Sequence, residues 1–111
     1  MKKYKIEILP AAFDDLHYIS EYVAQDNLTA ANRIVDKLIA SLRHLELFPL
    51  SAPPVPDIEL SEKGYRVLVC EKYLCFYCVA DETIFVCHIA HGVRSYPAML
   101  RRLDLEKKEK E

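Results

Sequence analysis

The sequence predicts an α+β fold of the order β-α-α-β-β-β, in which a helical hairpin packs on one face of a small antiparallel sheet. Two observations support this prediction: the first half of the chain has two stretches with apolar residues at helical spacing, and residues 65–90 contain three apolar runs of strand length. Short polar breaks, Glu71-Lys72 and Asp81-Glu82, separate the three runs and leave room only for hairpins. At 111 residues, the chain is long enough for one hydrophobic core and too short for two.

The amino-terminal segment predicts one strand and one helix. Residues 4–9 alternate between apolar and polar side chains, which favours a first edge strand, and Pro10 ends it because proline has no amide hydrogen to donate. The apolar spacing then becomes that of an amphipathic helix, which continues to about Gln25. We expect Asp14 and Asp15 on the polar side of this helix, in its first turn, where the helix dipole favours acidic groups.

A second helix and a long connection follow. Asp26-Asn27 supplies a break and an N-cap for this second, longer helix, and Phe48-Pro49 marks its end because the residue before a proline avoids the helical region. Residues 50–63 are predicted to form a crossing loop, since the prolines within 49–56 are incompatible with a helix or a central strand. A docking segment is the alternative interpretation of this loop.

The three apolar runs, residues 65–70, 73–80 and 83–90, have a predicted register. Two-residue loops place Arg66 opposite Tyr77 and Tyr77 opposite Val86. The next rows on the same face are Leu68, Cys75 and His88, then Cys70, Tyr73 and Ala90. This face carries the polar groups and is predicted to be open. The opposite face is nearly all apolar and is predicted to lie under the helices: Tyr65, Val67, Val69, Leu74, Phe76, Cys78, Phe85, Cys87 and Ile89. A three-residue first loop would instead turn the first strand over relative to the second.

The end of the chain is predicted to pass the rim of the open face. After a turn at Gly92 the sequence displays Arg94 and Tyr96, close to His91. Residues 98–105 predict a short last helix, and residues 106–111 a solvated tail of mixed charge. We therefore expect a single domain over residues 1–105 with a charged tail at 106–111.

Composition excludes several classes of function. The formal net charge is −2, and no segment builds a strong basic patch, so the molecule as a whole is not expected to attract nucleic acid electrostatically. No apolar run approaches the length of a membrane span, and no signal-like segment precedes the first strand, so we expect a cytoplasmic protein that does not bind membranes. A P-loop, a dinucleotide fingerprint and a nucleophile elbow are all missing from the sequence, and we expect no cofactor.

The cysteines do not predict a metal site. Cys75 and Cys78 are three positions apart on a predicted strand, which points them to opposite faces, whereas a zinc knuckle needs its paired thiolates on one turn. Cys70 and Cys87 lie in other strands with aliphatic neighbours. We predict reduced thiols that act as small hydrophobic side chains.

The candidate site residues are Arg66, His91, Arg94 and Tyr96, with His88 on the same predicted face. Arginine suits phosphate because its planar fork donates two parallel hydrogen bonds, and histidine or tyrosine can move a proton in cleavage of RNA assisted by the 2′-hydroxyl. A structural interpretation stands beside this one. Arg66 would pack its stem across tyrosine rings, His88 would be a satisfied histidine on a half-buried strand, and His91 would be a turn residue.

The chain resembles a known family at these residues. The run YRVLVCEKYLCFYCVADETIFVCHIAHGVRSY, preceded by two predicted helices and an LxxFP-like end at residues 45–49, is similar to the RelE/ParE superfamily of toxins from type II toxin–antitoxin modules. The likeness covers residues 4–103 and rests on Tyr65-Arg66, on Tyr73 with Phe76-Tyr77, and on His91-Gly92 with Arg94 and Tyr96. It implies a cytoplasmic toxin that is neutralised by a cognate antitoxin whose tail wraps the domain.

The resemblance leaves two mechanisms open. RelE-like members cut mRNA on the ribosome, and by resemblance Arg66, Arg94 and Tyr96, with His91, would be the catalytic residues. However, Leu68 and Leu74 stand where RelE-like toxins place two further cations. The ParE-like and plasmid-stabilisation branch, the closer match in YRVLV and YLCFY, inhibits growth by binding DNA gyrase. The resemblance therefore favours a gyrase-binding toxin, with a ribosome-dependent mRNA endonuclease and a non-toxic interaction module of the same fold as alternatives. Whether the protein is an enzyme stays open at this level.

Overall fold

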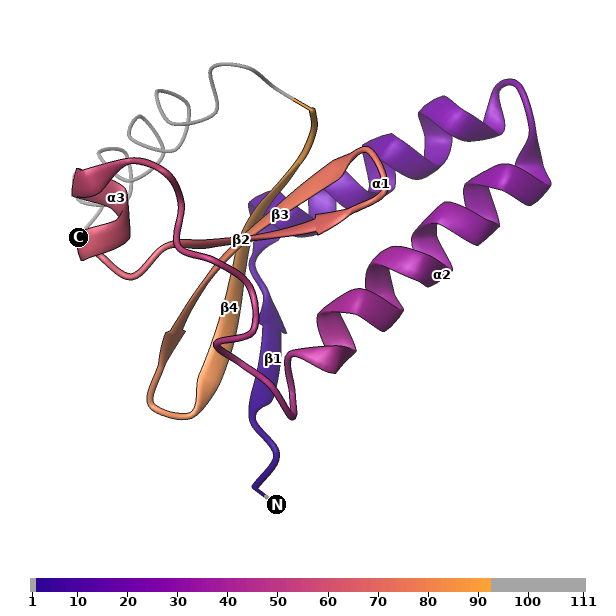
Figure 1. Ribbon diagram of the computed structural model, residues 1–111. Helices are drawn as coiled ribbons and strands as arrows, with labels where there is room; N and C mark the ends of the chain where they lie inside the picture. The colour runs from indigo at the N-terminus through magenta and orange to yellow at the C-terminus, as the bar shows by residue number, and fades with distance from the viewer. Residues whose placement is uncertain (1, 93–111) are drawn as a thin grey trace.

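A helical hairpin and a four-stranded sheet form the two main layers of the computed structural model, which describes residues 2–92 (Figure 1). The elements, in chain order, are β1 (Lys5–Ile8), α1 (Pro10–Ala24), α2 (Leu28–His44), α3 (Ile58–Glu62), β2 (Arg66–Cys70), β3 (Tyr73–Ala80) and β4 (Thr83–His91). The predicted α+β class and the predicted order of the main elements are confirmed. The predicted last helix at 98–105 and the tail at 106–111 lie outside the described residues.

The helices begin where the sequence supplies the right terminal residues. Pro10 stands in the first turn of α1, where its missing amide hydrogen costs nothing. The predicted break before α2 is confirmed: the Asn27 side chain accepts a hydrogen bond of 3.0 Å from the amide of Ala30. α2 ends at His44, a few residues before the predicted end at Phe48-Pro49.

The sheet has the order β1-β4-β3-β2, with β1 at one edge as predicted. The β2–β3 and β3–β4 pairs are antiparallel, but β1 pairs with β4 in parallel, so the predicted all-antiparallel sheet is wrong in this one pairing. A parallel pair requires a long crossover connection, and here the helices and the β2–β3 hairpin together provide it.

The predicted register holds across β2 and β3 and then fails in β4. Arg66 lies opposite Tyr77, and Tyr77 lies opposite Val86, as predicted. Beyond that row the ladder shifts, so that His88 lies opposite Phe76 instead of Cys75. Cys87 is the extra residue, which makes it the bulged position of the strand.

The helices cover the face that was predicted to be open, and this prediction is wrong. Cys75 and Tyr77 are fully buried, and they pack in the same cluster as Leu38 and Leu42 of α2. The polar groups of this face do not prevent its burial, because tyrosine and cysteine have apolar bodies, and the Tyr77 hydroxyl donates a hydrogen bond of 2.8 Å to the carbonyl of Pro49. The ring can therefore be buried without leaving a polar atom unsatisfied.

The other face of the sheet carries a second, smaller cluster. Phe76 is fully buried there with Val67 and Ala90, against Val55 and Leu60 from the connection between α2 and β2. Residues 50–63 are therefore more than a crossing loop, because they include α3 and cover part of the sheet. The predicted exclusion of a helix from this segment is wrong. The last proline is Pro56, and the Asp57 side chain then caps α3 by accepting a bond of 3.1 Å from the amide of Leu60.

Among residues 2–92, none of the helices has both the length and the apolar character that a membrane crossing requires.

Candidate functional site

Arg66, the first candidate residue, holds the chain's own backbone. Its guanidinium Nη1 donates to the carbonyl of Ala52 at 2.7 Å and lies 3.5 Å from the carbonyl of Leu50. The neighbouring Tyr77 hydroxyl reaches the carbonyl of Pro49 in the same segment. Arg66 and Tyr77 together therefore fix the chain between α2 and α3 against the sheet. This geometry supports the structural interpretation of Arg66, although the contacts are to carbonyl groups and not only to tyrosine rings.

His91, the second candidate, ends β4 and is exposed. It lies opposite Tyr73, with the two ring centroids 5.4 Å apart in an edge-to-face arrangement. Burial raises the pKa of Tyr73, and the negative charge of Glu71 raises this pKa further. Tyr73 therefore keeps its proton at neutral pH and could serve there as a hydrogen-bonding group or an acid, but not as a base.

The structure does not bring Arg66 and His91 together. Arg66 belongs to the row of Tyr77, whereas His91 belongs to the row of Tyr73, four positions along β3. At about 3.3 Å per residue, this is a separation of about 13 Å along the sheet. Arg94 and Tyr96 lie outside the described residues.

A polar cluster between α1 and β4 was not predicted. Asp15 of α1 accepts a hydrogen bond of 2.9 Å from the amide of Ile89, and the same carboxylate oxygen contacts Nδ1 of His88. β1 ends at Ile8, opposite Val86, so within residues 2–92 no strand lies beside this part of the β4 edge, and Asp15 satisfies the edge amide of Ile89. Asp15 was expected in the first turn and on the polar side of its helix, but α1 begins at Pro10, so Asp15 lies beyond the first turn. Its place directly before Leu16 of the buried stripe was the sequence signal for a position at the edge of the covered face.

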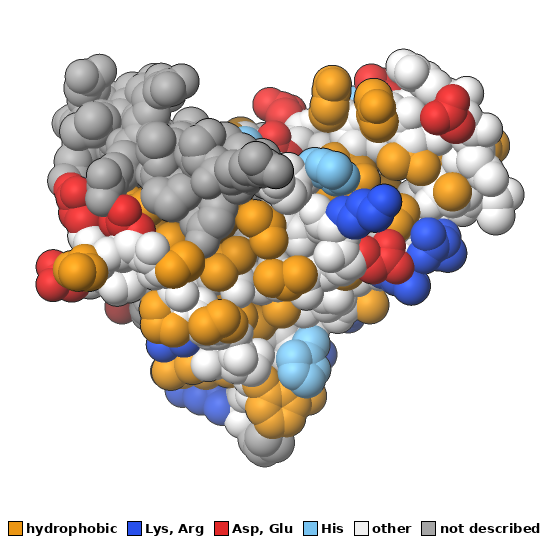
Figure 2. All heavy atoms as spheres, turned by 45° about the horizontal axis from the view of Figure 1, so that its top comes forward, with side chains coloured by type: hydrophobic (Ala, Val, Ile, Leu, Met, Phe, Trp, Pro, Cys, Tyr) orange, Lys and Arg blue, Asp and Glu red, His pale blue; other side chains and the backbone are white. Residues whose placement is uncertain are grey.

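Most basic side chains of residues 2–92 form ion pairs that lie in different parts of the surface. Lys37 and Arg33 of α2 reach the same oxygen of Glu71 in the β2–β3 turn, at 2.7 and 3.0 Å, and these hydrogen bonds hold the pKa of Glu71 below its ordinary value. Other pairs in the described part of the chain are Lys2 with Glu82, Lys3 and Arg43 with Glu46, and Lys63 with Glu59. In the view of Figure 2 the blue side chains lie in separate groups, and the group on the right has a red side chain among it. For the part of the chain that the structure describes, this arrangement does not resemble a phosphate-binding groove.

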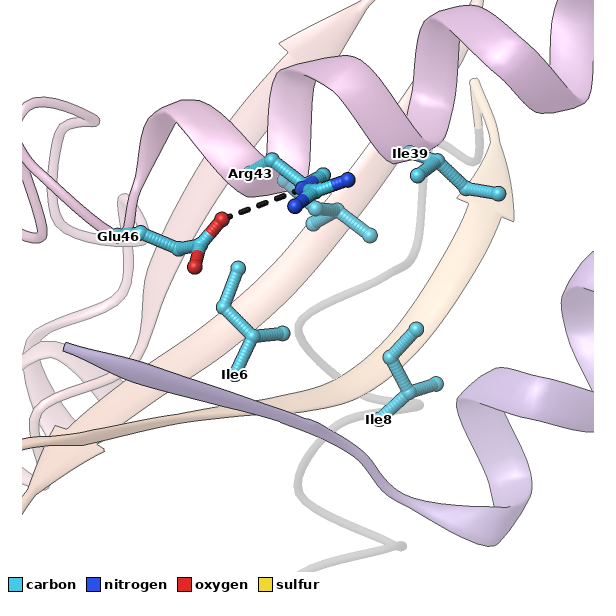
Figure 3. A pocket seen from close by; sticks show the side chains of 6 residues that line it. Ile6, Ile8, Ile39, Arg43 and Glu46 are labelled. Atoms are coloured by element: carbon cyan, nitrogen blue, oxygen red, sulfur yellow. Dashed lines mark hydrogen bonds and ion pairs between the residues drawn. The ribbon is translucent and has the colours of Figure 1, made fainter. Parts of the chain in front are cut away.

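A shallow hollow of about 190 Å³ lies between β1 and α2 (Figure 3). It is lined by Ile6, Ile8, Ile39 and Leu42, with the Arg43–Glu46 ion pair at its rim. Ligand pockets usually have volumes of about 300–1,000 Å³, so this hollow is small for a cofactor. Across residues 2–92, three or more metal-ligating side chains do not come together.

Comparisons with known proteins agree with the fold. A family model described as the ParE toxin of the type II toxin–antitoxin system parDE matches residues 6–96. Among solved structures, a chain of the chromosomal ParDE toxin–antitoxin system from P. aeruginosa is 19% identical, with a TM-score of 0.65 over 82% of this chain and 98% of that one. A chain of the toxin–antitoxin complex RelBE2 from Mycobacterium tuberculosis is also 19% identical, with a TM-score of 0.63 over 82% of this chain and 93% of that one.

No match was found among curated proteins. The two structural likenesses establish the fold, and the family model covers most of the sequence, including the described sheet and both long helices. The chain belongs to the ParE toxin family of type II toxin–antitoxin systems.

Proposed function

We propose that this protein is a growth-inhibiting toxin that acts in the cytoplasm by binding a protein target, DNA gyrase, and that a cognate antitoxin neutralises it. The observation that supports a binding mechanism over RNA cleavage is the position of Arg66. A catalytic arginine must donate to the phosphate in the transition state, but Arg66 donates to the carbonyl of Ala52 at 2.7 Å. Using Arg66 in catalysis would require the segment between α2 and α3 to lose this contact.

An antitoxin fits the edge of the sheet at β1. The outer edge of β1 has no strand partner within the described chain, and the apolar hollow against α2 lies beside it. Ile6 and Ile8 point from β1 into this hollow (Figure 3). Such a combination suits an extended segment that pairs with the strand edge and places an apolar side chain in the hollow. The matched structures from P. aeruginosa and M. tuberculosis come from a toxin–antitoxin system and a toxin–antitoxin complex, which supports this kind of partner.

A ribosome-dependent endonuclease is the second candidate. The exposed His91, packed edge-on against Tyr73, favours it, because histidine and tyrosine can transfer protons and His91 shortly precedes Arg94 and Tyr96 in the sequence. These residues would have to supply both the proton transfer and the phosphate contacts, since Arg66 lies about 13 Å away along the sheet.

The test is to induce the chain in bacterial cells and to follow the synthesis of DNA, RNA and protein separately. We expect DNA synthesis to fall first, mRNA to stay intact, and co-expression of the product of a neighbouring reading frame to restore growth. If protein synthesis fell first, with cut mRNA, the endonuclease would replace the gyrase-binding toxin. Normal growth at high expression would favour a non-toxic interaction module.

A further inference from the structure

Two cysteines of neighbouring strands lie close together on the sheet face that points away from α1 and α2. Cys78 of β3 lies two positions beyond Phe76, so both side chains are on the face away from the long helices. Cys87 of β4 follows Val86, which is buried on the helix-covered face, so Cys87 is also on the face away from the helices. Their sulfur atoms are 4.0 Å apart, and both residues are half-buried. No part of the proposed toxin activity uses these thiols.

We propose that Cys78 and Cys87 form a redox-active pair that closes to a reversible intramolecular disulfide in the presence of a low-molecular-weight disulfide such as oxidised glutathione. The thiolate of one cysteine attacks a sulfur of oxidised glutathione, forms a mixed disulfide and releases one glutathione thiolate. The second cysteine then attacks the protein sulfur of the mixed disulfide and releases the second glutathione. In balance, two protein S–H bonds become one S–S bond, and the two electrons and two protons pass to glutathione.

The bulge in β4 is what makes this pair unusual. Cys78 lies opposite Phe85, so Cys87 is a diagonal neighbour. Diagonal Cα atoms in antiparallel sheets are typically about 7–8 Å apart, which is at or beyond the limit of about 7 Å for a disulfide. Because Cys87 is the bulged residue, it can move without breaking a residue pair of the ladder. A bond made by such a movement is easily reduced again, as is typical of regulatory disulfides rather than structural ones.

The chain contains its own unreactive cysteines for comparison. Cys75 is fully buried on the opposite face, and burial raises its pKa to about 12, so its reactive thiolate is scarce at neutral pH. Cys70 is also buried on the helix-covered side. The proposed pair differs from both in its partial exposure and in the neighbouring sulfur at 4.0 Å.

The test is to equilibrate the purified, reduced full chain in buffers of increasing oxidised-to-reduced glutathione ratio, block the remaining thiols by alkylation, and map the peptides by mass spectrometry. A protease that cuts at Asp81 or Glu82 separates Cys78 from Cys87, so a disulfide between them appears as a cross-linked pair of peptides. A Glu-specific protease also cuts at Glu71 and so separates Cys70, but Cys75 stays in the same fragment as Cys78, and the variant Cys75→Ala therefore identifies which of these two cysteines carries the bond.

We expect the cross-linked pair in the wild type and in Cys75→Ala, its complete loss in Cys78→Ser and in Cys87→Ser, and its disappearance when reduced glutathione is restored. Wild-type protein in which both cysteines remain alkylatable at every ratio would overturn the proposal. Stable mixed disulfides at the two sites, or disulfides between two copies of the chain, would do the same. The wild-type result alone decides the matter if a serine variant fails to fold.

Discussion

At the scale of single residues, Arg66 shows that a side chain of a type common in catalysis can instead stabilise the fold. Its guanidinium joins the start of β2 to the carbonyl of Ala52, and Tyr77, opposite it on β3, donates to the carbonyl of Pro49. Side chains of two strands thereby hold the irregular segment between α2 and α3. This segment makes few backbone hydrogen bonds to the start of β2, among them Val55 with Tyr65 and Val67 with Pro53. Removing the guanidinium leaves a part-buried carbonyl without its donor.

We predict that Arg66→Met lowers the free energy of unfolding by about 1.5–3 kcal/mol, the range for hydrogen bonds that involve a charged group. The matched control is Arg33→Met, which removes an exposed ion pair with Glu71 and should cost less than about 1 kcal/mol. Urea titration of the three proteins measures both differences. Equal losses in the two variants would show that Arg66 contributes no more to stability than a surface charge.

The buried ionisable side chains predict a loss of stability at alkaline pH. Burial raises the pKa of Cys75 from 9.0 to about 12, and burial also raises the pKa of Tyr77 above 10.0. The folded state therefore holds these protons more tightly than the unfolded state, so the contribution of Cys75 is complete below pH 9 and is lost as pH rises toward 12. One such group gives a slope of about 1.4 kcal/mol per pH unit.

We predict that the free energy of unfolding begins to fall near pH 9 in the wild type and only near pH 10 in Cys75→Ala, where Tyr77 remains. Denaturant titrations at a series of pH values give the free energy of unfolding as a function of pH for each protein. The pH at which this curve begins to fall is compared, and not the free energy itself, because the smaller side chain also changes the stability at neutral pH. An identical onset in both proteins would assign the alkaline transition to other groups.

At the scale of elements, the connection between α2 and β2 stabilises the sheet as a second layer. Phe76 is fully buried among Val55, Leu60 and Val67, on the face that α1 and α2 do not cover. We expect Phe76→Ala to cost about 3–5 kcal/mol and Leu38→Ala, in the larger cluster, about 2–5 kcal/mol.

A double-mutant cycle distinguishes the two faces. Leu60 of α3 shares a cluster with Phe76, whereas Leu38 of α2 packs on the other side of the sheet. We predict that Phe76→Ala and Leu60→Ala are non-additive by at least about 0.5 kcal/mol, and that Phe76→Ala and Leu38→Ala add within about 0.5 kcal/mol. The opposite pattern of coupling would place Phe76 under the long helices.

The elements themselves could be predicted because their signals are local. Apolar spacing identified both long helices and all four strands, Asn27 identified the start of α2, and the two-residue turns set the β2–β3 register. The covered face could not be predicted in the same way, because Tyr77 and Cys75 on one face are as easily buried as Phe76 and Leu74 on the other.

Features that depend on tertiary contacts could not be predicted from the sequence. The bulge at Cys87 carries no glycine to mark it, and the parallel pairing of β1 depends on which edge of the finished sheet is vacant. The same holds for the candidate site. The residue type of Arg66 suggested phosphate chemistry, and only the position of the Ala52 carbonyl shows that the guanidinium has a structural partner.

At the scale of the whole molecule, the distribution of charge and the family agree with a protein partner. The formal net charge is −2, and within residues 2–92 most basic side chains are paired with acids, as Arg33 and Lys37 are with Glu71. A nucleic-acid enzyme of this size would be expected to gather its cations along one groove. The exposed apolar residues, by contrast, include Phe13, Tyr18 and Tyr22 along α1, side chains that suit contact with another protein.

The supercoiling of relaxed plasmid DNA by purified gyrase, in the presence of the purified protein, tests the proposed function most directly. We predict that supercoiling falls as the protein is titrated in, and that adding the antitoxin restores it. The protein is purified from a strain in which its induction arrests growth and in which co-expression of the antitoxin reverses that arrest, so the sample is known to be active. Undiminished supercoiling at a large excess of such a preparation would contradict the proposal that this ParE-family chain inhibits growth by binding gyrase.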